Sequence, residues 1–291
     1  MTNLQLFAAC VAIWGSTWIA ITFQLGPVAP EASVFYRFLL ASLLLFGWCL
    51  ARGLPLRFGR REHLWIAFQG ALMFSVSYVA VYYAEQYVVS GLVAVGYSAS
   101  PLLNMVGMRV FFGSPMTLRV GAGALLGIAG ITLVFWPEFS HLQADGQVAL
   151  GAAFTVAAVV LSALSNMVAQ RNHAAGVPVW QSMAWGMFYG ALFTLGIVLA
   201  LGRPLAFEAT PAYVLSLLYL AVFGSILAFG GFLTLLGRVG PARAGYVGVM
   251  VPIVALAISS AFEGYRWQLL ALVGVAVSVA GNVIILRRPG A

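Results

Sequence analysis

Three sets of polar side chains recur at helical spacing inside strongly apolar stretches of the sequence. They are Ser75, Tyr78, Tyr82 with Glu85 or Gln86; Tyr97, Ser100 and Asn104; and Ser162, Ser165, Asn166 and Gln170. Residues three or four positions apart share one face of a helix. A single hydroxyl or amide in such a place more often makes a hydrogen bond to a neighbouring helix. Three polar faces together favour a cavity that binds a ligand.

Aromatic residues lie deep in the same stretches, and their ring faces suit an amphipathic organic molecule or an ammonium group. For any one of them, a place in the packed core is an equally good interpretation. Taking the polar and aromatic sets together, we expect the substrate to be bound by Trp14, Thr17, Tyr78, Tyr82, Tyr97, Ser100, Asn104, Ser165, Asn166, Trp185 and Tyr246.

Arg37 is the one basic residue well inside an apolar stretch. Its guanidinium could bind a substrate carboxylate, form an ion pair with an acid such as Glu85, or extend to the membrane surface. We favour the ion pair, with a structural role.

Two prolines interrupt apolar stretches at matching places, Pro101 in GYSASPLLNM and Pro252 in GVMVPIVALA. Proline has no N–H, so Pro101 leaves the carbonyl of Tyr97 without its helical donor. With the nearby Gly96 and Gly248, the two prolines are predicted to be hinge or gating points.

The elements that hold these residues are membrane helices. Apolar residues make up 63% of the chain and charged residues 7%, with a mean hydropathy of +1.01, which is outside the range of soluble domains. Stretches of about 20 apolar residues, each long enough to cross a bilayer, predict an all-α polytopic protein with ten transmembrane helices. The predicted spans are 3–25, 31–51, 62–85, 88–112, 117–136, 146–170, 178–201, 211–236, 241–262 and 267–287.

The short connections leave no room for a soluble catalytic or nucleotide-binding domain. The phosphate-binding GxxxxGK[ST] loop, the HExxH motif, the GxSxG elbow and paired intramembrane aspartates are all missing from the sequence. We therefore predict no enzyme activity, catalytic residue, metal site or cofactor. No acid lies confidently at the middle of a span, which argues against a carboxylate proton relay.

The arginines predict the orientation. With the N-terminus in the cytoplasm, eleven of the fourteen basic residues fall at inner connections and two at outer ones. This positive-inside bias places both termini in the cytoplasm. The net charge of +7 then reflects topology and contact with anionic lipid, and not nucleic-acid binding.

Identities at a constant offset of 151 positions indicate an internal repeat. The pairs are Pro101 with Pro252, Phe111 with Phe262, Gly113 with Gly264, Gly123 with Gly274, and Gly130 with Gly281. Each predicted unit, residues 1–140 and 141–291, holds five spans, and an odd number makes the second unit an inverted copy. Inverted repeats are common in secondary transporters, with the site between the repeats near the midplane.

Small residues line one face of the fifth and tenth spans: Gly123, Gly127 and Gly130, and Gly274, Ser278 and Gly281. Such faces let helices approach closely, so these spans could form a scaffold or the interface of a homodimer.

Four segments carry a family resemblance: WGSTW (14–18), APEASVFYRFLLA (29–41), SASP (98–101) and GALLGIAGITLVF (123–135). They resemble the drug/metabolite transporter (DMT) superfamily, its EamA-type ten-helix exporters, and within these the YddG-type amino-acid exporters. The resemblance implies a cavity formed by spans 1–4 and 6–9, and export of amino acids, often aromatic ones. Members commonly carry a glutamate in a GER-like corner, where this chain has Gly113-Ser114-Pro115.

We therefore predict a multi-pass carrier of the bacterial inner membrane that exports amino acids and related metabolites by alternating access. Its partners would be this small-molecule substrate and membrane lipid. A multidrug or nucleotide-sugar carrier of the same superfamily, a channel and a lipid flippase remain as alternatives.

Overall fold

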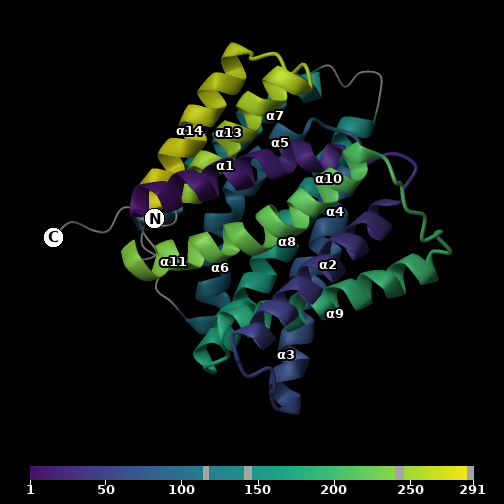
Figure 1. Cartoon of the computed structure of the whole chain (residues 1–291). Helices are drawn as coiled ribbons and strands as arrows, with labels where there is room; N and C mark the ends of the chain where they lie inside the picture. Colours follow the sequence, from purple (N-terminus) through teal and green to yellow (C-terminus); the bar gives the residue numbers. More distant parts are fainter. Residues whose placement is uncertain (114–117, 141–145, 240–245, 287–291) are drawn as a thin grey trace.

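The computed structural model describes residues 1–113, 118–140, 146–239 and 246–286, and all regular secondary structure within these ranges is helical (Figure 1). The elements are α1 (Asn3–Thr22), α2 (Pro30–Ala51), α3 (Arg60–Ala71), η1 (Leu72–Val76), α4 (Ser77–Ala84), α5 (Ser90–Gly96), η2 (Tyr97–Ala99), α6 (Ser100–Phe112), α7 (Leu118–Ser140), α8 (Gln147–Ala174), α9 (Val179–Ala200), α10 (Pro211–Tyr219), η3 (Leu220–Leu227), α11 (Ala228–Val239), α13 (Tyr246–Phe262) and α14 (Leu269–Leu286).

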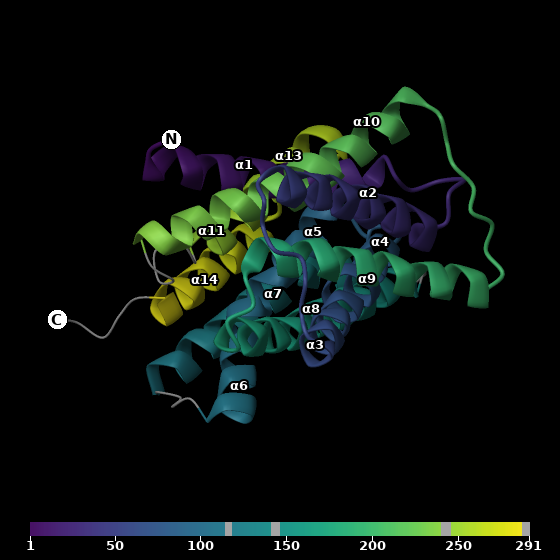
Figure 2. The same ribbon diagram turned by 60° about the horizontal axis from the view of Figure 1, so that its bottom comes forward.

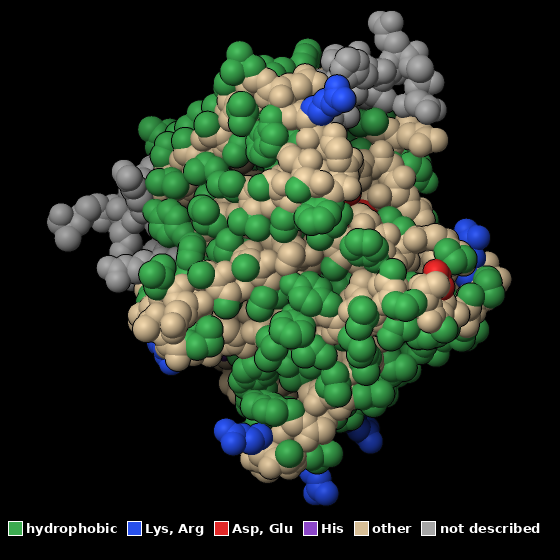
Figure 3. Space-filling model, turned by 45° about the horizontal axis from the view of Figure 1, so that its top comes forward, with side chains coloured by type: hydrophobic (Ala, Val, Ile, Leu, Met, Phe, Trp, Pro, Cys, Tyr) green, Lys and Arg blue, Asp and Glu red, His purple; other side chains and the backbone are tan. Residues whose placement is uncertain are grey.

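Seven helical segments of the described ranges are long and apolar enough to cross a membrane, and three shorter apolar helices, Gly121–Trp136, Tyr246–Phe262 and Leu269–Ile284, fall in the remaining predicted spans. On the face shown in Figure 3, hydrophobic side chains predominate and arginine side chains lie towards the margins. The predicted class, an all-α polytopic membrane protein, is confirmed.

Two spans contain π-helical segments that the sequence did not predict. The segment η1 lies between α3 and α4, and η3 lies between α10 and α11. Shifting Leu72–Val76 by 151 positions places it on 223–227, within η3. Because π-helical segments are rare and often occur at functional sites, their matched positions indicate that a functional site lies beside them.

The two prolines act differently on the backbone. In the first half a 3₁₀ turn separates α5 from α6, and Pro101 lies in the first turn of α6, where proline is tolerated. The N–H of Ser100 donates to the carbonyl of Tyr97. The expectation that this carbonyl is free was therefore wrong, because the tighter turn supplies a donor. In the second half Pro252 lies inside the continuous helix α13 and cannot donate to the carbonyl of Gly248.

The small-residue faces of α7 and α14 pack against each other within the chain. A Cβ added at Gly274 would lie 2.7 Å from the carbonyl oxygen of Gly130, and one added at Gly281 would lie 2.5 Å from that of Gly123. These faces are therefore scaffold, and a homodimer through them is not supported because they are already occupied.

Helix pairing has the same pattern in both halves. The first helix of one half, α1, packs on α11 and α13, and its counterpart α8 packs on α4 and α6; α2 pairs with α9, and α5 with α13. In Figures 1 and 2, the start of α1 and the end of α14 lie at the same end of the bundle, where the Arg238 guanidinium donates to the Met1 carbonyl at 2.9 Å. We propose on this pattern that residues 1–140 and 141–291 are two inverted units.

Candidate substrate cavity

A cavity of about 360 Å³ lies between the two proposed units. Its size falls in the range of roughly 300–1,000 Å³ that is typical of small-molecule sites. Its lining residues come from both halves of the chain: Trp14, Thr17, Trp18, Ile21, Arg37, Met73, Tyr78, Val81, Ala94, Tyr97, Ser100, Pro101, Asn104, Ser162, Asn166, Phe229, Phe232, Gly248, Val251 and Pro252.

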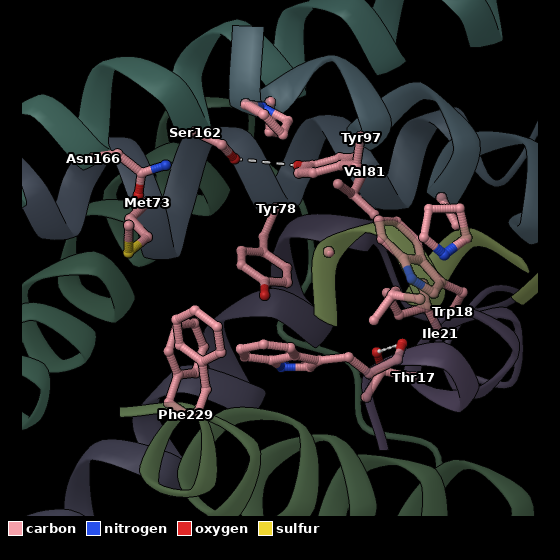
Figure 4. Close-up of a pocket in the computed structure, with 18 of the residues that line it drawn as sticks. Thr17, Trp18, Ile21, Met73, Tyr78, Val81, Tyr97, Ser162, Asn166 and Phe229 are labelled. Atoms are coloured by element: carbon pink, nitrogen blue, oxygen red, sulfur yellow. Dashed lines mark hydrogen bonds between the residues drawn. The ribbon is translucent and has the colours of Figure 1, made fainter. Parts of the chain in front are cut away.

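Most of the residues expected at the substrate site meet in this lining. They are Trp14, Thr17, Tyr78, Tyr97, Ser100, Asn104 and Asn166, with the expected hinge residues Pro101, Pro252 and Gly248. Their convergence from α1, α4, η2, α6, α8 and α13 places aromatic faces, hydroxyls and amides around one space (Figure 4).

Five expected residues lie outside this lining. Tyr82 is fully buried beside Arg37, Ser165 donates to the carbonyl of Ser162 at 2.7 Å, and Tyr246 is the first residue of α13. The other two, Trp185 and Gly96, lie in different surroundings.

The Trp185 indole donates to the carbonyl of Leu56 at 2.9 Å and meets the His63 ring edge-on. Gly96 lines a separate apolar cavity of about 390 Å³ between α6, α7 and α8. Trp185 is thus part of an aromatic cluster around the loop before α3, remote from the polar residues of the main cavity.

The aromatic wall of the cavity is built on Trp14. Its ring centroid lies 5.2 Å from that of Phe229, edge-on, and 5.4 Å from that of Phe232. Its indole N–H donates to the carbonyl of Gly224 in η3 at 3.2 Å. The π-helical segment therefore helps to fix the Trp14 ring, and a second pair, Trp18 and Tyr97, has centroids 5.2 Å apart.

The polar groups of the cavity form two small pairs. The hydroxyls of Tyr97 and Ser162 lie 3.3 Å apart (Figure 4), and the Asn166 amide donates to the Asn104 side-chain carbonyl at 3.0 Å. Within the described part of the chain, the remaining amide donor of Asn104 and acceptor of Asn166 make no hydrogen bond. The amide pair can therefore serve a ligand as both donor and acceptor.

Arg37 also lies in the lining, although only 2% of its surface is exposed. Its Nε donates to the Ser225 hydroxyl at 3.3 Å, and the Tyr78 ring lies 4.6 Å from its Cζ. No carboxylate forms an ion pair with Arg37 among the residues that the structure describes, and the carboxyl oxygens of Glu85 are buried without a partner. The favoured ion pair with Glu85 is thus not formed, because no Glu85 oxygen comes within ion-pair distance of the guanidinium, although the two groups interact electrostatically.

One end of the bundle is closed by contacts between α5 and α13. The N–H of Gly91 donates to the Ser259 hydroxyl at 2.9 Å, and Glu263 accepts hydrogen bonds from the N–H and the hydroxyl of Ser90 at 3.1 and 2.6 Å. Towards the opposite end, α6 has no buried residue. Hydrogen bonds therefore close the bundle at the α5–α13 end, whereas α6 is packed less tightly at the other end.

Met73, Phe229 and Phe232 also line the cavity, although they were not predicted from the sequence. Ser225, Phe229 and Phe232 follow each other at steps of four and three, so they share one helix face. That spacing was a usable signal, whereas Met73 is brought to the cavity by η1, which has no sequence motif of its own.

The sequence also matches a known protein family. The EamA-like transporter family matches residues 2–136 and 149–287. The chain belongs to the EamA-like transporter family. This confirms the resemblance to the DMT superfamily, and it places the chain among membrane transporters and not among enzymes.

Relatives of this EamA-like transporter cover nearly its whole length. The "Uncharacterized inner membrane transporter YedA" of Escherichia coli K12 is 29% identical over 97% of this chain and 90% of its own. "Protein PecM" of Dickeya dadantii is 27% identical over 98% and 92%. The "Probable terminal-alkyne amino-acid exporter" of Streptantibioticus cattleyicolor is 28% identical over 96% and 91%.

A solved crystal structure shares the fold. It matches with a TM-score of 0.70 at 16% sequence identity, covering 97% of this chain and 95% of that one. At this identity the likeness concerns the fold of the EamA-like chain alone.

Proposed function

We propose that this EamA-like transporter exports amphipathic amino acids, aromatic ones among them, across the bacterial inner membrane. The observation that carries the proposal is the cavity itself, which combines the ring faces of Trp14, Phe229 and Tyr78 with a buried arginine and an amide pair. An amino acid has the matching parts: an apolar side chain, an ammonium and a carboxylate.

The names of two relatives support the two parts of the proposal, which are transport across the inner membrane and an amino-acid substrate. One is named an inner membrane transporter, and another is named a probable amino-acid exporter. The YddG-type preference for aromatic substrates rests on the aromatic wall and on the sequence resemblance.

Alternating access would use the two ends of the cavity in turn. In the structure the α5–α13 end is closed by Gly91, Ser90, Ser259 and Glu263. The distribution of the arginines predicts that the N-terminus lies in the cytoplasm, which makes this the outer end, and we propose on that basis that the structure is an inward-facing state. Rocking of one unit against the other would part α5 from α13 and draw α6 over the opposite mouth.

The 3₁₀ turn before Pro101 and the carbonyl of Gly248, to which Pro252 cannot donate, are the soft points of this motion. Both prolines lie in the cavity lining, so a bend at either changes the shape of the site.

Transport into proteoliposomes tests the proposal. Purified protein should give saturable counterflow of labelled tryptophan and phenylalanine, with weaker counterflow of leucine, and unlabelled substrate should compete. Conductance without saturation would indicate a channel, and transport of a quaternary ammonium drug without any amino acid would indicate a multidrug carrier; either result would contradict the proposal.

A further inference from the structure

We infer that the Arg37 guanidinium is the binding partner of the substrate's carboxylate. This inference rests on the proposed function and names the contact that selects a carboxylate over a neutral or purely cationic molecule. It replaces the structural ion pair that the sequence favoured.

The side chain of Arg37 is held in place from several sides. Its Nε donates to Ser225, its Cζ lies 4.6 Å from the ring of Tyr78 and 5.1 Å from that of Phe38, and its Nη2 lies near the Cα of Gly224. These contacts orient the guanidinium, and the hydrogen bond to Ser225 occupies its Nε. Tyr82 also lies beside the guanidinium, and the terminal nitrogens make no hydrogen bond within the described ranges, so they are the groups that can bind a ligand.

The guanidinium forms no ion pair within the described ranges, although the buried Glu85 interacts with it electrostatically. Its Nη1 is buried and makes no hydrogen bond within the described ranges. Glu31 accepts from the Tyr83 hydroxyl at 2.6 Å, and Glu263 binds Ser90. Glu85 interacts with Arg37 electrostatically but makes no hydrogen bond to it. A buried charge without a partner is strongly unfavourable, so this arrangement calls for an anion.

The cavity is the place from which that anion can come, because Arg37 is part of its lining. A carboxylate matches the planar fork of a guanidinium and can accept two parallel hydrogen bonds from it. An amphipathic substrate would then direct its carboxylate to Arg37 and its apolar part to the rings of Trp14 and Phe229.

Three probes that share an indole ring distinguish the contribution of the carboxylate to binding from that of the ammonium group. Tryptophan carries both groups, tryptamine lacks the carboxylate, and indole-3-propionate lacks the ammonium. Calorimetric titration of the purified protein should show tryptamine binding about 10- to 100-fold more weakly than tryptophan, as expected for the loss of a hydrogen bond to a charged group. Equal affinity for tryptophan and tryptamine would overturn the inference.

Arg37→Gln should weaken tryptophan binding by about the same factor and abolish the preference over tryptamine. Arg171→Gln is the matched control, because Arg171 also stacks on an aromatic ring, with its Cζ 4.7 Å from the Trp65 ring, but lies outside the cavity lining. If Arg37→Gln does not fold, Arg37→Lys retains the charge without the fork and should keep only part of the preference. A preference that survives either Arg37 substitution in full would contradict the inference.

The outcomes also separate this inference from the proposed function. Binding of indole-3-propionate with exclusion of tryptophan would contradict an amino-acid substrate and retain Arg37 as the carboxylate partner. Transport of tryptophan with equal binding of tryptamine would retain the amino-acid exporter and contradict the role of Arg37. Binding of none of the three probes would count against both.

Discussion

Replacing Glu263 with glutamine should open the end of the bundle at which α5 meets α13. The carboxylate of Glu263 accepts the N–H of Ser90 at 3.1 Å with one oxygen and the Ser90 hydroxyl at 2.6 Å with the other, and it also accepts the hydroxyl of Ser259. A glutamine amide has one acceptor and one donor group, so at least one of these donors loses its partner. The two contacts with Ser90 join the halves, so they break when α5 and α13 separate.

The size of the effect follows from the number of bonds. A hydrogen bond to a charged group contributes about 1.5–3 kcal/mol. Loss of one such bond lowers the ratio of closed to open molecules by roughly 10- to 100-fold, because 1.4 kcal/mol corresponds to a factor of ten. A ratio change of this size makes a minor open state detectable.

The assay is the distance between two spin labels in protein reconstituted in lipid nanodiscs. Gln86 and Gln268 are exposed residues in the connections before α5 and after α13, and cysteines there can be labelled once the buried Cys10 and Cys49 are replaced. Glu263→Gln should add or enlarge a population at longer distance.

The control for this measurement is Glu208→Gln. Glu208 accepts the Thr210 hydroxyl at 2.9 Å within one loop, so its loss breaks a similar contact without separating α5 from α13. Distance distributions that are identical for wild type and Glu263→Gln would refute the view that this contact holds the end closed.

Two further substitutions test the backbone contacts. Gly70→Val should destabilise the protein by about 1–3 kcal/mol, because a Cβ there meets the carbonyl oxygen of Gly186. The control Gly196→Val places its side chain in open space and should leave the stability unchanged. Thermal unfolding in detergent measures both variants. Pro252→Ala supplies an N–H to the carbonyl of Gly248, so it should raise the unfolding temperature and slow tryptophan counterflow, and unchanged counterflow would limit Pro252 to a structural role.

The helices could be predicted closely because hydropathy and length define membrane spans. The span predicted at 31–51 is the helix Pro30–Ala51, and that at 178–201 is Val179–Ala200. The segments η1, η2 and η3 could not be predicted, because they depend on hydrogen bonds that the tertiary structure imposes. The Trp14 indole donating to the carbonyl of Gly224 in η3 at 3.2 Å is one such bond.

The candidate site could be predicted in part for a similar reason. Asn104 and Asn166 stood out because amides are costly in lipid, and the structure brings them together at 3.0 Å. The sequence could not distinguish Trp185 from Trp14, because an indole is equally compatible with a cavity, a packed core or a helix end. Only the packing separates them, with Trp185 bonded to Leu56 and Trp14 in the cavity lining. The partner of Arg37 likewise depends on tertiary distances.

Blocking the cavity tests most directly whether it is the transport site. Gly248 lies in the cavity lining, and a Cβ added there would meet no atom within 4 Å, so the indole of Gly248→Trp would fill the site. Met250→Trp places the same group at an exposed position of α13 outside the lining. Saturable tryptophan counterflow in proteoliposomes should be lost in folded Gly248→Trp and retained in Met250→Trp. Counterflow in Gly248→Trp equal to that of the wild type would contradict the account.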